Sequence, residues 1–544
     1  MSDASQARTA AAENAAHLAA TTAMFCTYDI RAVVNETTFN RNTLKRLGLA
    51  FANWLKAQPE TTPLERPLRV AIGYDARLQS PEFYEAFIQG LNCSGISAVK
   101  LGLVPTTLVY FAEVATTDAD LKAQLLKASI ETPDAVDASV TVTASHNPKE
   151  YNGLKFTFKG NSLSAAQILE IKHAYLETPL PQATAGTSLE SEFTQYSQFS
   201  QNSAETSDSV SNLDWDPRKA YTAWASHVFT TEPSALTLIV DSGNGAAGVI
   251  APELFKAMGY NVVSLYETPD GNFPNHHPDP CAAENLKDLQ AAVIKHQADL
   301  GIAFDGDGDR MGIVDNAGEI IPGDRLMMLL AQEILARPEV QQLAEKPAIV
   351  SEVKCSQHLF NAIDAMGGRA IMSPTGHAIM KHSMLDADAI LGGELSGHIF
   401  YRLGHWGFDD GMYAALCLLR LLKDQKQQNP EMSVHRLLQA FPASALSQEH
   451  RVKLEKAKHA QAVNALKAIA QTAYDAQELC GGLLVLSLNT VDGIRANLAG
   501  GFWLVRASNT EPCLTLRCEA PDASSLKQLE SWMLQTVHDL IRTL

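Results

Sequence analysis

A pattern of strand, polar loop, helix, glycine and strand occurs three times along the chain, and it limits the possible folds more than any other feature. The copies span residues 69–101, 236–266 and 348–372. This order is typical of a βαβ unit in which glycine caps the end of the helix. The copies start about 110 to 170 residues apart, so three similar α/β domains are favoured over one large sheet.

Each copy predicts three elements. The predicted strand, helix and strand are 69–77, 81–95 and 96–101; then 236–245, 251–259 and 260–266; then 348–355, 357–368 and 369–372. After about residue 438 the chain changes character. Helical stretches are followed there by predicted strands at 501–508 and 513–520 and by a closing helix from about residue 524. The sequence therefore predicts three mixed α/β domains and a C-terminal α+β domain.

Length and composition agree with this division. A chain of 544 residues suggests three or four domains of about 150 residues each. The chain carries 43 Lys and Arg against 61 Asp and Glu, a formal net charge of −18. This balance argues against nucleic acid or an anionic membrane as the main partner. It leaves open small phosphorylated ligands, which need only a locally basic pocket.

Cysteine usage and the N-terminus point to a cytoplasmic protein. The eight cysteines are scattered without a CxxC pair, as in a reduced protein rather than a disulfide scaffold or a zinc site. Residues 1–24 lack the basic start and apolar core of a signal peptide, so we expect a loose N-terminal extension. No apolar run approaches the ~18 residues of a membrane span.

The domain boundaries follow from changes in composition. Residues 182–212 are rich in Ser, Gln and Thr, which is typical of a surface insertion or linker. The predicted segments are an N-terminal extension (1–24), domain 1 (25–181), the insertion (182–212), domain 2 (213–320), domain 3 (321–437) and domain 4 (438–544).

The stretch TASHNP (143–148) places a serine at the end of a strand predicted at 137–144. Ser145 should then project from the carboxyl end of that strand, where open α/β sheets place their ligands. The glycines of a hydrolase nucleophile elbow are absent around it. Because adjacent side chains diverge, we expect His146 to be badly placed as its base. Such a serine can still react if it already carries a transferable group.

The stretch DGDGDR, within 298–315, is the sharpest chemical signal. Asp305, Asp307 and Asp309 alternate with glycines directly after a predicted strand, so a tightly curled loop can bring the three carboxylates together. Clustered carboxylates repel unless a divalent cation lies among them, and oxygen ligands suit Mg²⁺ or Ca²⁺. An EF-hand would need Gly and Glu where Arg310 and Asn316 stand. Mg²⁺ is favoured over calcium and over a solvated acidic turn.

The stretch RASNTEP (506–512) joins the last two strands and is rich in donors. These are Arg506, Ser508, Asn509 and Thr510. A guanidinium with hydroxyls and an amide suits a phosphate, which offers only acceptors. An ordinary polar hairpin loop remains the alternative.

The stretch GELSGH, within 389–400, places polar side chains just past a predicted strand. Glu394 and Ser396 can bind a pair of sugar hydroxyls, and His398 can contact a phosphate or transfer protons. A buried structural carboxylate is the alternative. Lys155 and His377 are further candidates for proton transfer, although a single Lys or His is more often structural or solvated.

A competing motif is the outline of a dinucleotide fingerprint in DSGNGAAG. Its glycines, with spacing GxGxxG, are Gly243, Gly245 and Gly248. Glu267 follows about 20 residues later, as that fingerprint requires. However, the polar Asp241 falls where the strand should still be apolar, and a dinucleotide site gives no role to Ser145 or the aspartates. A dehydrogenase is therefore disfavoured.

Together these motifs resemble the α-D-phosphohexomutase family. TASHNP is similar to its phosphoserine loop, DGDGDR to its Mg²⁺ loop, GELSGH to its sugar loop and RASNTEP to its phosphate-binding loop. The four occur in the family's order, one in each of four domains, and the similarity runs from about residue 25 to the end. YDIRAVV, SEVKC, PTGH and GFDDGMY most resemble the bacterial phosphomannomutase/phosphoglucomutase branch.

The resemblance implies a fold of four domains around a central cleft and an isomerase of carbohydrate metabolism. Such an enzyme interconverts hexose 1-phosphate and hexose 6-phosphate, of mannose, glucose or both. It works through a phosphoserine at Ser145 and a hexose 1,6-bisphosphate that is both intermediate and activator. One Mg²⁺ per chain would be bound by the Ser145 phosphate and by Asp305, Asp307 and Asp309.

The resemblance also implies residue roles. The catalytic residues would be Ser145, Lys155, His377 and Arg310. The substrate-binding residues would be Tyr28, Arg31, Lys354, Glu394, Ser396, His398, Arg506, Ser508, Asn509 and Thr510. The expected partners are small hexose phosphates, with no nucleic acid or membrane, for a cytoplasmic monomer or weak homodimer. A phosphoserine-dependent phosphatase and a non-catalytic sugar-phosphate sensor remain alternatives.

Overall fold

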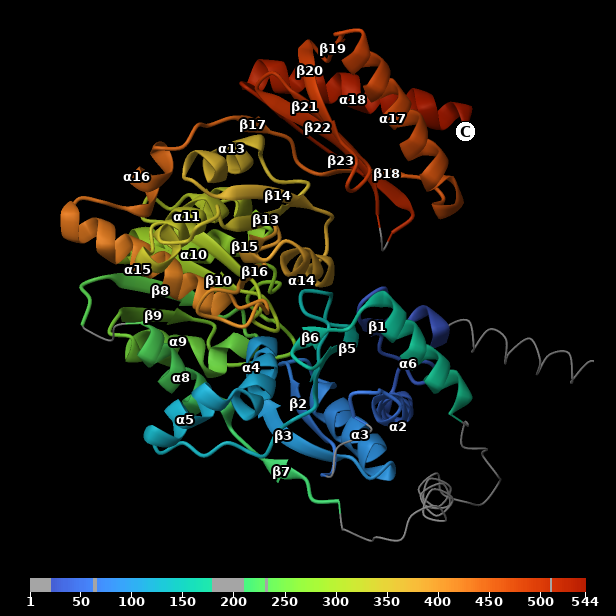
Figure 1. The fold of residues 1–544 in the computed structure, drawn as a ribbon, viewed down its shortest axis with the longest axis vertical. Coiled ribbons are helices and arrows are strands. Elements are labelled where there is room, and N and C mark those ends of the chain that lie inside the picture. The colour runs from blue at the N-terminus through green and yellow to red at the C-terminus, as the bar shows by residue number, and fades with distance from the viewer. Residues whose placement is uncertain (1–20, 62–65, 179–209, 230–232, 509–510) are drawn as a thin grey trace, which may run out of the picture. The chain divides into compact units, whose positions relative to one another are not determined.

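The computed structural model describes residues 21–61, 66–178, 210–229, 233–508 and 511–544. The chain divides into two compact units, Met1–Met311 and Gly312–Leu544. The described residues form four β-sheets that are covered by helices (Figure 1). The prediction of an α/β fold is confirmed.

The first sheet lies in the first unit and has the strand order β1-β5-β4-β2-β3-β7, with β6 paired to β5. Strand β2 is parallel to β3 and β4, whereas β5 is antiparallel to β4 and β1. The strands are β1 (Ile30–Val33), β2 (Arg69–Tyr74), β3 (Ser97–Leu103), β4 (Ala138–Val142), β5 (Tyr151–Phe158), β6 (Asn161–Ser162) and β7 (Leu213–Asp214). The helices are α2 (Arg41–Lys56), α3 (Ser80–Cys93), α4 (Thr106–Thr117), α5 (Ala119–Lys127) and α6 (Ala165–Glu177).

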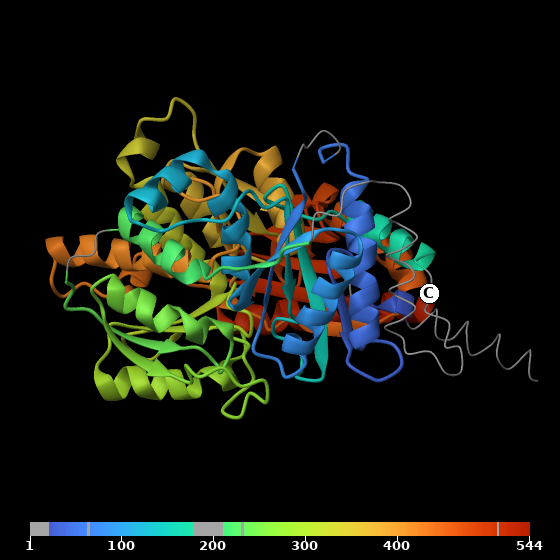
Figure 2. The same cartoon turned by 90° about the horizontal axis from the view of Figure 1, so that it is seen from below.

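Helices cover both faces of this sheet, as a fully buried parallel strand requires. All five residues of β4 are buried. Helices α2, α3 and α6 share one apolar core with the strands. Helix α4 contacts β2 and β4 and also packs against α8 (Pro217–Val228), where the Phe111 ring lies 5.2 Å from that of Tyr221. Figure 2 shows this sheet and its helices from below, with α2, α3 and α4 in blue, α6 in teal and α8 in green.

The second βαβ layer also lies in the first unit. Strand β8 (Thr237–Asp241) lies between β9 (Asn261–Leu265) and β10 (Leu300–Phe304), and it is parallel to both. The helices here are α8, η1 (Ala246–Val249), α9 (Ala251–Ala257), η2 (Ala283–Leu286) and α10 (Lys287–His296). Parallel strands that end side by side bring their loops to one edge, where the DSGNG and DGDGDR loops follow β8 and β10.

The second unit contains the third and fourth sheets. The third has the order β14-β13-β15-β16 and the fourth β17-β23-β22-β21-β20-β19, with β18 on β23. The third-domain elements, with the preceding hairpin, are β11 (Met311–Asp315), β12 (Ile320–Ile321), α11 (Gly323–Leu335), α12 (Pro338–Gln341), β13 (Ala348–Glu352), α13 (Gln357–Ala365), β14 (Arg369–Ser373), α14 (His377–Asp386), β15 (Ala389–Gly393), β16 (Ile399–Tyr401), α15 (Gly411–Gln428) and α16 (Val434–Gln439). Strands β11 and β12 are antiparallel.

The fourth sheet is antiparallel where its long strands pair. Its elements are β17 (Ala445–Leu446), β18 (His450–Lys453), η3 (Lys456–Lys458), α17 (His459–Asp475), β19 (Leu479–Cys480), β20 (Leu483–Asn489), β21 (Ile494–Leu498), β22 (Gly501–Ala507), β23 (Cys513–Ala520) and α18 (Ala523–Thr543). Helices α17 and α18 pack on this sheet (Figure 1). The rings of Trp503 and Trp532 lie 5.6 Å apart. The predicted C-terminal α+β domain is confirmed.

The three predicted βαβ copies are present. They are β2-α3-β3, β8-α9-β9 and β13-α13-β14, and the two strands of each copy are parallel. The glycine after each helix has a positive φ: 73° at Gly95, 86° at Gly259 and 92° at Gly367. Since an L side chain is strained in this left-handed region, glycine is the residue that ends each helix most easily.

Two predicted boundaries can be compared with the described residues. The predicted second domain begins at residue 213, but Leu213 and Asp214 pair with Val99 and Lys100 of β3 and so extend the first sheet. Met24, at the end of the predicted N-terminal extension, is buried in the first core. Residues 1–20, and 179–209 of the predicted insertion and its flank, lie outside the described residues. Among the described helices, none is long and apolar enough to cross a bilayer.

Glu113 is a buried carboxylate between α4 and the β4–β5 pair. One of its oxygens accepts a hydrogen bond from Thr157 Oγ1 at 2.6 Å, and the other accepts from the backbone N–H of Gly160. Burial raises the pKa of Glu113 to about 7, against an ordinary value of 4.5. The folded protein therefore binds this proton more tightly than the unfolded chain.

Substituting Glu113→Gln should change how stability depends on pH. The wild-type contribution is fully present below pH 4.5 and is lost as pH rises through about 7, because the native pKa is the higher one. Between pH 4.5 and 8, the free energy of unfolding of the wild type should fall by about 3 kcal/mol relative to that of Glu113→Gln. Calorimetric melting of both proteins at several pH values measures this. Parallel pH profiles of the two proteins would contradict it.

Candidate active site

Ser145 lies just past the end of β4, and its side chain meets the acidic loop within the first unit. Its Oγ donates to Asp305 Oδ2 at 2.6 Å, and the side chain is fully buried. Its backbone N–H donates to Thr143 Oγ1 at 2.8 Å. Its φ is 52°, a left-handed value that is disfavoured for a residue with a side chain.

The expectation that the side chain of His146 diverges from that of Ser145 is wrong. His146 Nδ1 lies 3.3 Å from Ser145 Oγ. Divergence of neighbouring side chains holds for extended backbone, and the left-handed φ of Ser145 takes this loop out of that conformation. The serine thus has an imidazole beside it, although the shorter contact of its Oγ is with Asp305.

The acidic loop follows β10 and brings its three carboxylates together. Oxygens of Asp305, Asp307 and Asp309 all lie within 4.8 Å of one another, and all three side chains are fully buried. Lys155 Nζ donates to Asp307 Oδ2 at 2.7 Å and also contacts Asp309 Oδ2. Thr106 Oγ1, in the first turn of α4, donates to Asp307 Oδ2 at 2.6 Å. This acidic cluster could hold a metal ion.

The charges of the cluster affect its members differently. Burial, with the charges of Asp307 and Asp309, raises the pKa of Asp305 well above its usual range. Burial also works against the charge of Asp307, but Lys155 and Thr106 hold the pKa of Asp307 far below its usual range. The three buried carboxylates have two cations beside them, the Lys155 ammonium and the Arg310 guanidinium, so the cluster carries one formal negative charge in excess.

The donor set fits a hard divalent cation. Asp307 Oδ1 is buried and has no hydrogen-bond partner among the described residues. An uncompensated buried carboxylate oxygen is costly unless a cation takes up its charge. The surrounding ligand atoms are all oxygens, which is the ligand set that Mg²⁺ prefers.

Arg77 is a site residue that sequence reasoning missed. It is buried and paired with Asp75, and its guanidinium donates to four carbonyls of the segment after β4. The acceptors are the backbone oxygens of Ser145, Asn147, Pro148 and Tyr151, at 2.6–2.8 Å. The available signal was the polar stretch that follows β2 at the same sheet edge as Ser145.

Replacing Arg77 with Met should destabilise the first unit. The substitution leaves Asp75 as a buried carboxylate without its ion-pair partner, a change that typically costs about 3–5 kcal/mol. We expect the first calorimetric transition to fall by about 6 °C or more. The control Arg218→Met removes an exposed ion pair with Asp216 and should shift the transition little. Equal shifts for both variants would contradict the role of Arg77.

Three further predicted residues lie in the first unit: Arg31 and Tyr28 at the edge strand β1, and Arg310 in the acidic loop. Arg31, in β1, donates to Asn147 Oδ1 at 2.6 Å and pairs with Asp29 at 2.8 Å. It therefore contacts the serine loop directly. Tyr28 precedes β1 and is half-buried, and burial raises the pKa of its phenol. Arg310 lies beside Asp305, with Nε 3.7 Å from Oδ2.

In the second unit, the GELSGH and PTGH loops meet. Glu394 follows β15 and accepts from the backbone N–H of Gly376 at 2.7 Å. Its other oxygen lies 3.0 Å from His398 Nδ1 and accepts from Ser396 Oγ at 3.2 Å. His377 begins α14, and its ring stacks on that of His398 at 5.5 Å. Four predicted residues thus form one cluster.

Asp409 of the GFDDGMY stretch belongs to this cluster, and the sequence analysis assigned it no role. It is fully buried, and Lys381 Nζ lies 2.7 Å from its Oδ1. His377 Nδ1 and His398 Nε2 each lie 3.9 Å from its Oδ2. The available signal was the motif itself, since Asp409 follows His398 by 11 residues and His377 by 32.

The predicted phosphate-binding cations are paired with carboxylates. Arg506 Nε donates to Asp492 at 2.6 Å. Lys354 lies 3.4 Å from Glu449 and 3.5 Å from Glu352. Burial opposes the charge of Lys354, but these two carboxylates hold its pKa above its ordinary value. Asn509 and Thr510 lie outside the described residues, whereas Ser508 Oγ accepts from the Glu511 N–H at 3.0 Å.

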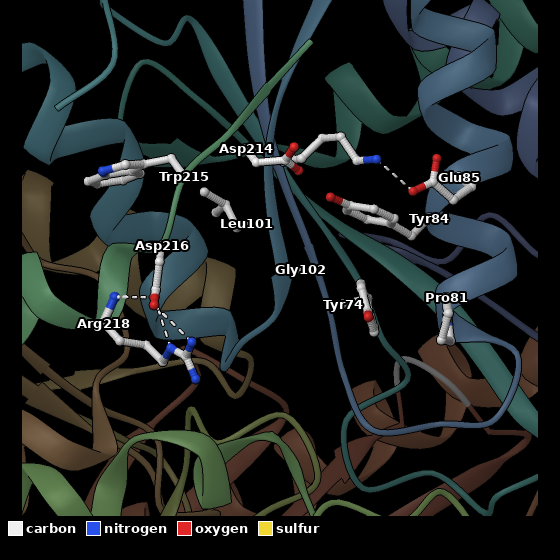
Figure 3. A pocket seen from close by; sticks show the side chains of 11 residues that line it. Tyr74, Pro81, Tyr84, Glu85, Leu101, Gly102, Asp214, Trp215, Asp216 and Arg218 are labelled. Atoms are coloured by element: carbon white, nitrogen blue, oxygen red, sulfur yellow. Dashed lines mark hydrogen bonds and ion pairs between the residues drawn. The ribbon is translucent and has the colours of Figure 1, made fainter.

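A separate cavity of about 570 Å³ lies at the outer edge of the first sheet (Figure 3). Aromatic side chains and charged groups line it, among them Tyr74, Tyr84 and Trp215. Its two cations, Lys100 and Arg218, are each paired with a carboxylate at 2.8 Å. None of the predicted site residues that the structure describes lines this cavity.

Comparison with known families matches nearly the whole chain. Residues 22–180, 219–318 and 322–443 match the alpha/beta/alpha domains I, II and III of the phosphoglucomutase/phosphomannomutase family. Residues 449–534 match the family's C-terminal domain. The four matches follow one another in the order that the four predicted motifs have.

Individual relatives are similar over most of their length. The chain is 38% identical over 507 residues to a phosphomannomutase/phosphoglucomutase of Pseudomonas syringae pv. tomato, covering 93% of each chain. It is 35% identical over 508 residues to one of Pseudomonas aeruginosa, covering 93% of this chain and 94% of the relative. A crystal structure of a phosphoglucomutase/phosphomannomutase family protein from Burkholderia thailandensis superposes with a TM-score of 0.77 at 32% identity, covering 95% of this chain and 97% of that one. The chain therefore belongs to the phosphoglucomutase/phosphomannomutase family.

Proposed function

We propose that this chain is a phosphohexomutase that interconverts hexose 1-phosphate and hexose 6-phosphate through a phosphoserine at Ser145. The observation that carries the proposal is the hydrogen bond from Ser145 Oγ to Asp305, beside two further buried carboxylates. A serine that both carries and donates a phosphoryl group needs a centre of positive charge at its oxygen. The carboxylate oxygens of the cluster can bind a divalent cation, and this cation supplies the positive charge.

The metal in this proposal is one Mg²⁺ held by Asp305, Asp307, Asp309 and the Ser145 phosphate. When bound, it withdraws charge from the transferring phosphoryl group. Lys155, within hydrogen-bond reach of Asp307, acts in proton transfer with the substrate hydroxyl. Arg310 adds positive charge beside Asp305.

Residues of the second unit would bind the substrate. Glu394 and Ser396 accept and donate to neighbouring sugar hydroxyls, and His398 and His377 lie beside them. If these groups bind the 3- and 4-hydroxyls, the 2-hydroxyl is not distinguished, so both mannose and glucose phosphates serve as substrates. Arg506 and Lys354 bind the phosphate that is not reacting. This phosphate must then replace Asp492 as the partner of Arg506 and Glu449 as the partner of Lys354.

Further parts of the proposal concern partners and location. A hexose 1,6-bisphosphate is the intermediate and primes the serine when it has lost its phosphate. The net charge of −18 disfavours nucleic acid and anionic membranes as partners. We propose that the protein is a cytoplasmic monomer or weak homodimer.

Phosphorus NMR tests the function. The purified chain with Mg²⁺, mannose 1-phosphate and a trace of hexose 1,6-bisphosphate should build up a 6-phosphate signal without free phosphate. A parallel tube with glucose 1-phosphate measures the preference between the two sugars. Accumulation of inorganic phosphate would instead identify a phosphatase, and binding without any turnover would identify a sugar-phosphate sensor.

A further inference from the structure

The loop between β9 and η2, residues 266–282, contacts both the serine loop and the acidic loop within the first unit. We call it the bridging loop. It belongs to the second βαβ layer, whereas Ser145 belongs to the first sheet. Its contacts with these two loops indicate how it contributes to the proposed chemistry.

Ring and backbone contacts hold the bridging loop against its neighbours. The ring of Phe273 lies 5.8 Å from the Arg77 guanidinium, which holds the serine loop. Pro278 is buried beside Gly306 of the acidic loop. A Cβ at Gly306 would lie 2.5 Å from the backbone oxygen of Ser145 and 3.4 Å from Pro278 Cγ. The serine loop, acidic loop and bridging loop are therefore in direct contact at this point.

A hydrogen bond also joins the bridging loop to the serine loop. His277 Nε2 lies 2.6 Å from the backbone oxygen of His146, the residue after Ser145. Because a carbonyl only accepts, the imidazole donates this hydrogen bond. Arg77 donates to the carbonyls on either side, those of Ser145 and Asn147. The carbonyl between them is bound by the bridging loop.

Hydrogen bonds of the two residues before His277 hold the backbone of the bridging loop in place. The preceding His276 is held by Asp241, whose fully buried carboxylate lies 3.0 Å from Nε2 of His276. Nδ1 of His276 lies 2.9 Å from the backbone oxygen of His277. Asn275 Nδ2 donates to Asn244 Oδ1 at 2.8 Å. The backbone that carries the His277 ring is thus fixed from the DSGNG loop.

We propose that His277 is a positioning residue that keeps Ser145 in its left-handed conformation and aimed at the acidic cluster. The left-handed φ of 52° at Ser145 is disfavoured for a non-glycine residue, and contacts of the serine loop with its neighbours stabilise it. His277 supplies one of those contacts, and it supplies it from the layer that carries the aspartates. It thereby couples the position of the serine to that of the metal ligands. This proposal rests on the proposed phosphoserine function.

The test compares His277→Leu with His277→Gln in the full-length chain. His277→Leu removes the donor, and we expect kcat of hexose 1-phosphate conversion to fall about three- to tenfold. KM should stay within about twofold, since His277 is not among the proposed substrate contacts. His277→Gln restores an N–H donor of similar reach and should recover most of the activity. The control His173→Leu removes an exposed imidazole from α6 and should leave kcat unchanged.

Two readouts separate this proposal from others. A wild type without mutase activity would overturn the proposed function, whatever the His277 variants do. With an active wild type, the positioning role would be wrong if His277→Leu kept full kcat or if His277→Gln were equally impaired. It would also be wrong if a fall in melting temperature or a change in KM accounted for the loss. Loss of kcat alone, with rescue by Gln, supports it.

Discussion

Ser145→Ala is expected to abolish the interconversion of hexose 1-phosphate and hexose 6-phosphate. The substitution removes the oxygen that would carry the phosphoryl group, so no covalent step can begin, and activity should fall by at least about a thousandfold. It also removes the hydrogen bond to Asp305. Phosphorus NMR measures the conversion, and intact-mass spectrometry after exposure to a hexose 1,6-bisphosphate should detect added phosphate on the wild type only.

The matched control is Ser129→Ala. Ser129 is an exposed serine of the same domain that also has a positive φ, of 60°. Its variant therefore makes the same chemical change at the same kind of backbone position and should keep full activity. If Ser145→Ala retained wild-type conversion, the phosphoserine mechanism would be excluded.

Asp307→Asn should weaken metal binding strongly. The substitution neutralises a fully buried carboxylate whose Oδ1 has no hydrogen-bond partner among the described residues. We expect the affinity for Mg²⁺ to fall about a hundredfold or more, and activity at limiting Mg²⁺ to fall with it. Isothermal titration calorimetry measures the affinity. Melting curves with and without Mg²⁺ should show a metal-induced rise for the wild type and a smaller one for the variant.

Asp120→Asn is the control for this substitution. Asp120 is an exposed residue in the first turn of α5, so its variant removes one negative charge from the same unit without touching the cluster. Its Mg²⁺ affinity should equal that of the wild type. Unchanged Mg²⁺ affinity in Asp307→Asn would mean that the acidic loop is not the metal site.

The βαβ copies were predictable because their signals are local. An apolar run, a polar loop and a terminal glycine each reflect the backbone preference of a few neighbouring residues. Gly95 shows this, because glycine tolerates its φ of 73° without the strain that a side chain would add. The convergence of Asp305, Asp307 and Asp309 was local in the same sense, because three alternating residues on one tight loop need no distant contact to meet.

The contacts around Ser145 were not predictable in this way. Its left-handed φ, which turns it toward His146, contradicts the expectation from strand alternation. Arg77 reaches the Ser145 carbonyl across 68 residues of sequence, and His277 reaches that of His146 across 131. Which of several arginines and histidines meets which carbonyl depends on strand order and register rather than on residue type.

The sequence alone therefore determined the βαβ layers, the C-terminal α+β domain and the loops that carry the candidate chemistry. The tertiary structure decided which buried partners hold those loops: Arg77 under the serine loop, Lys155 between two aspartates, and Asp409 beside two histidines. The physical reason is that secondary structure follows from short-range periodicity and backbone preference. Which buried charges and carbonyls pair depends instead on how strands that are distant in sequence are ordered and aligned in the sheets.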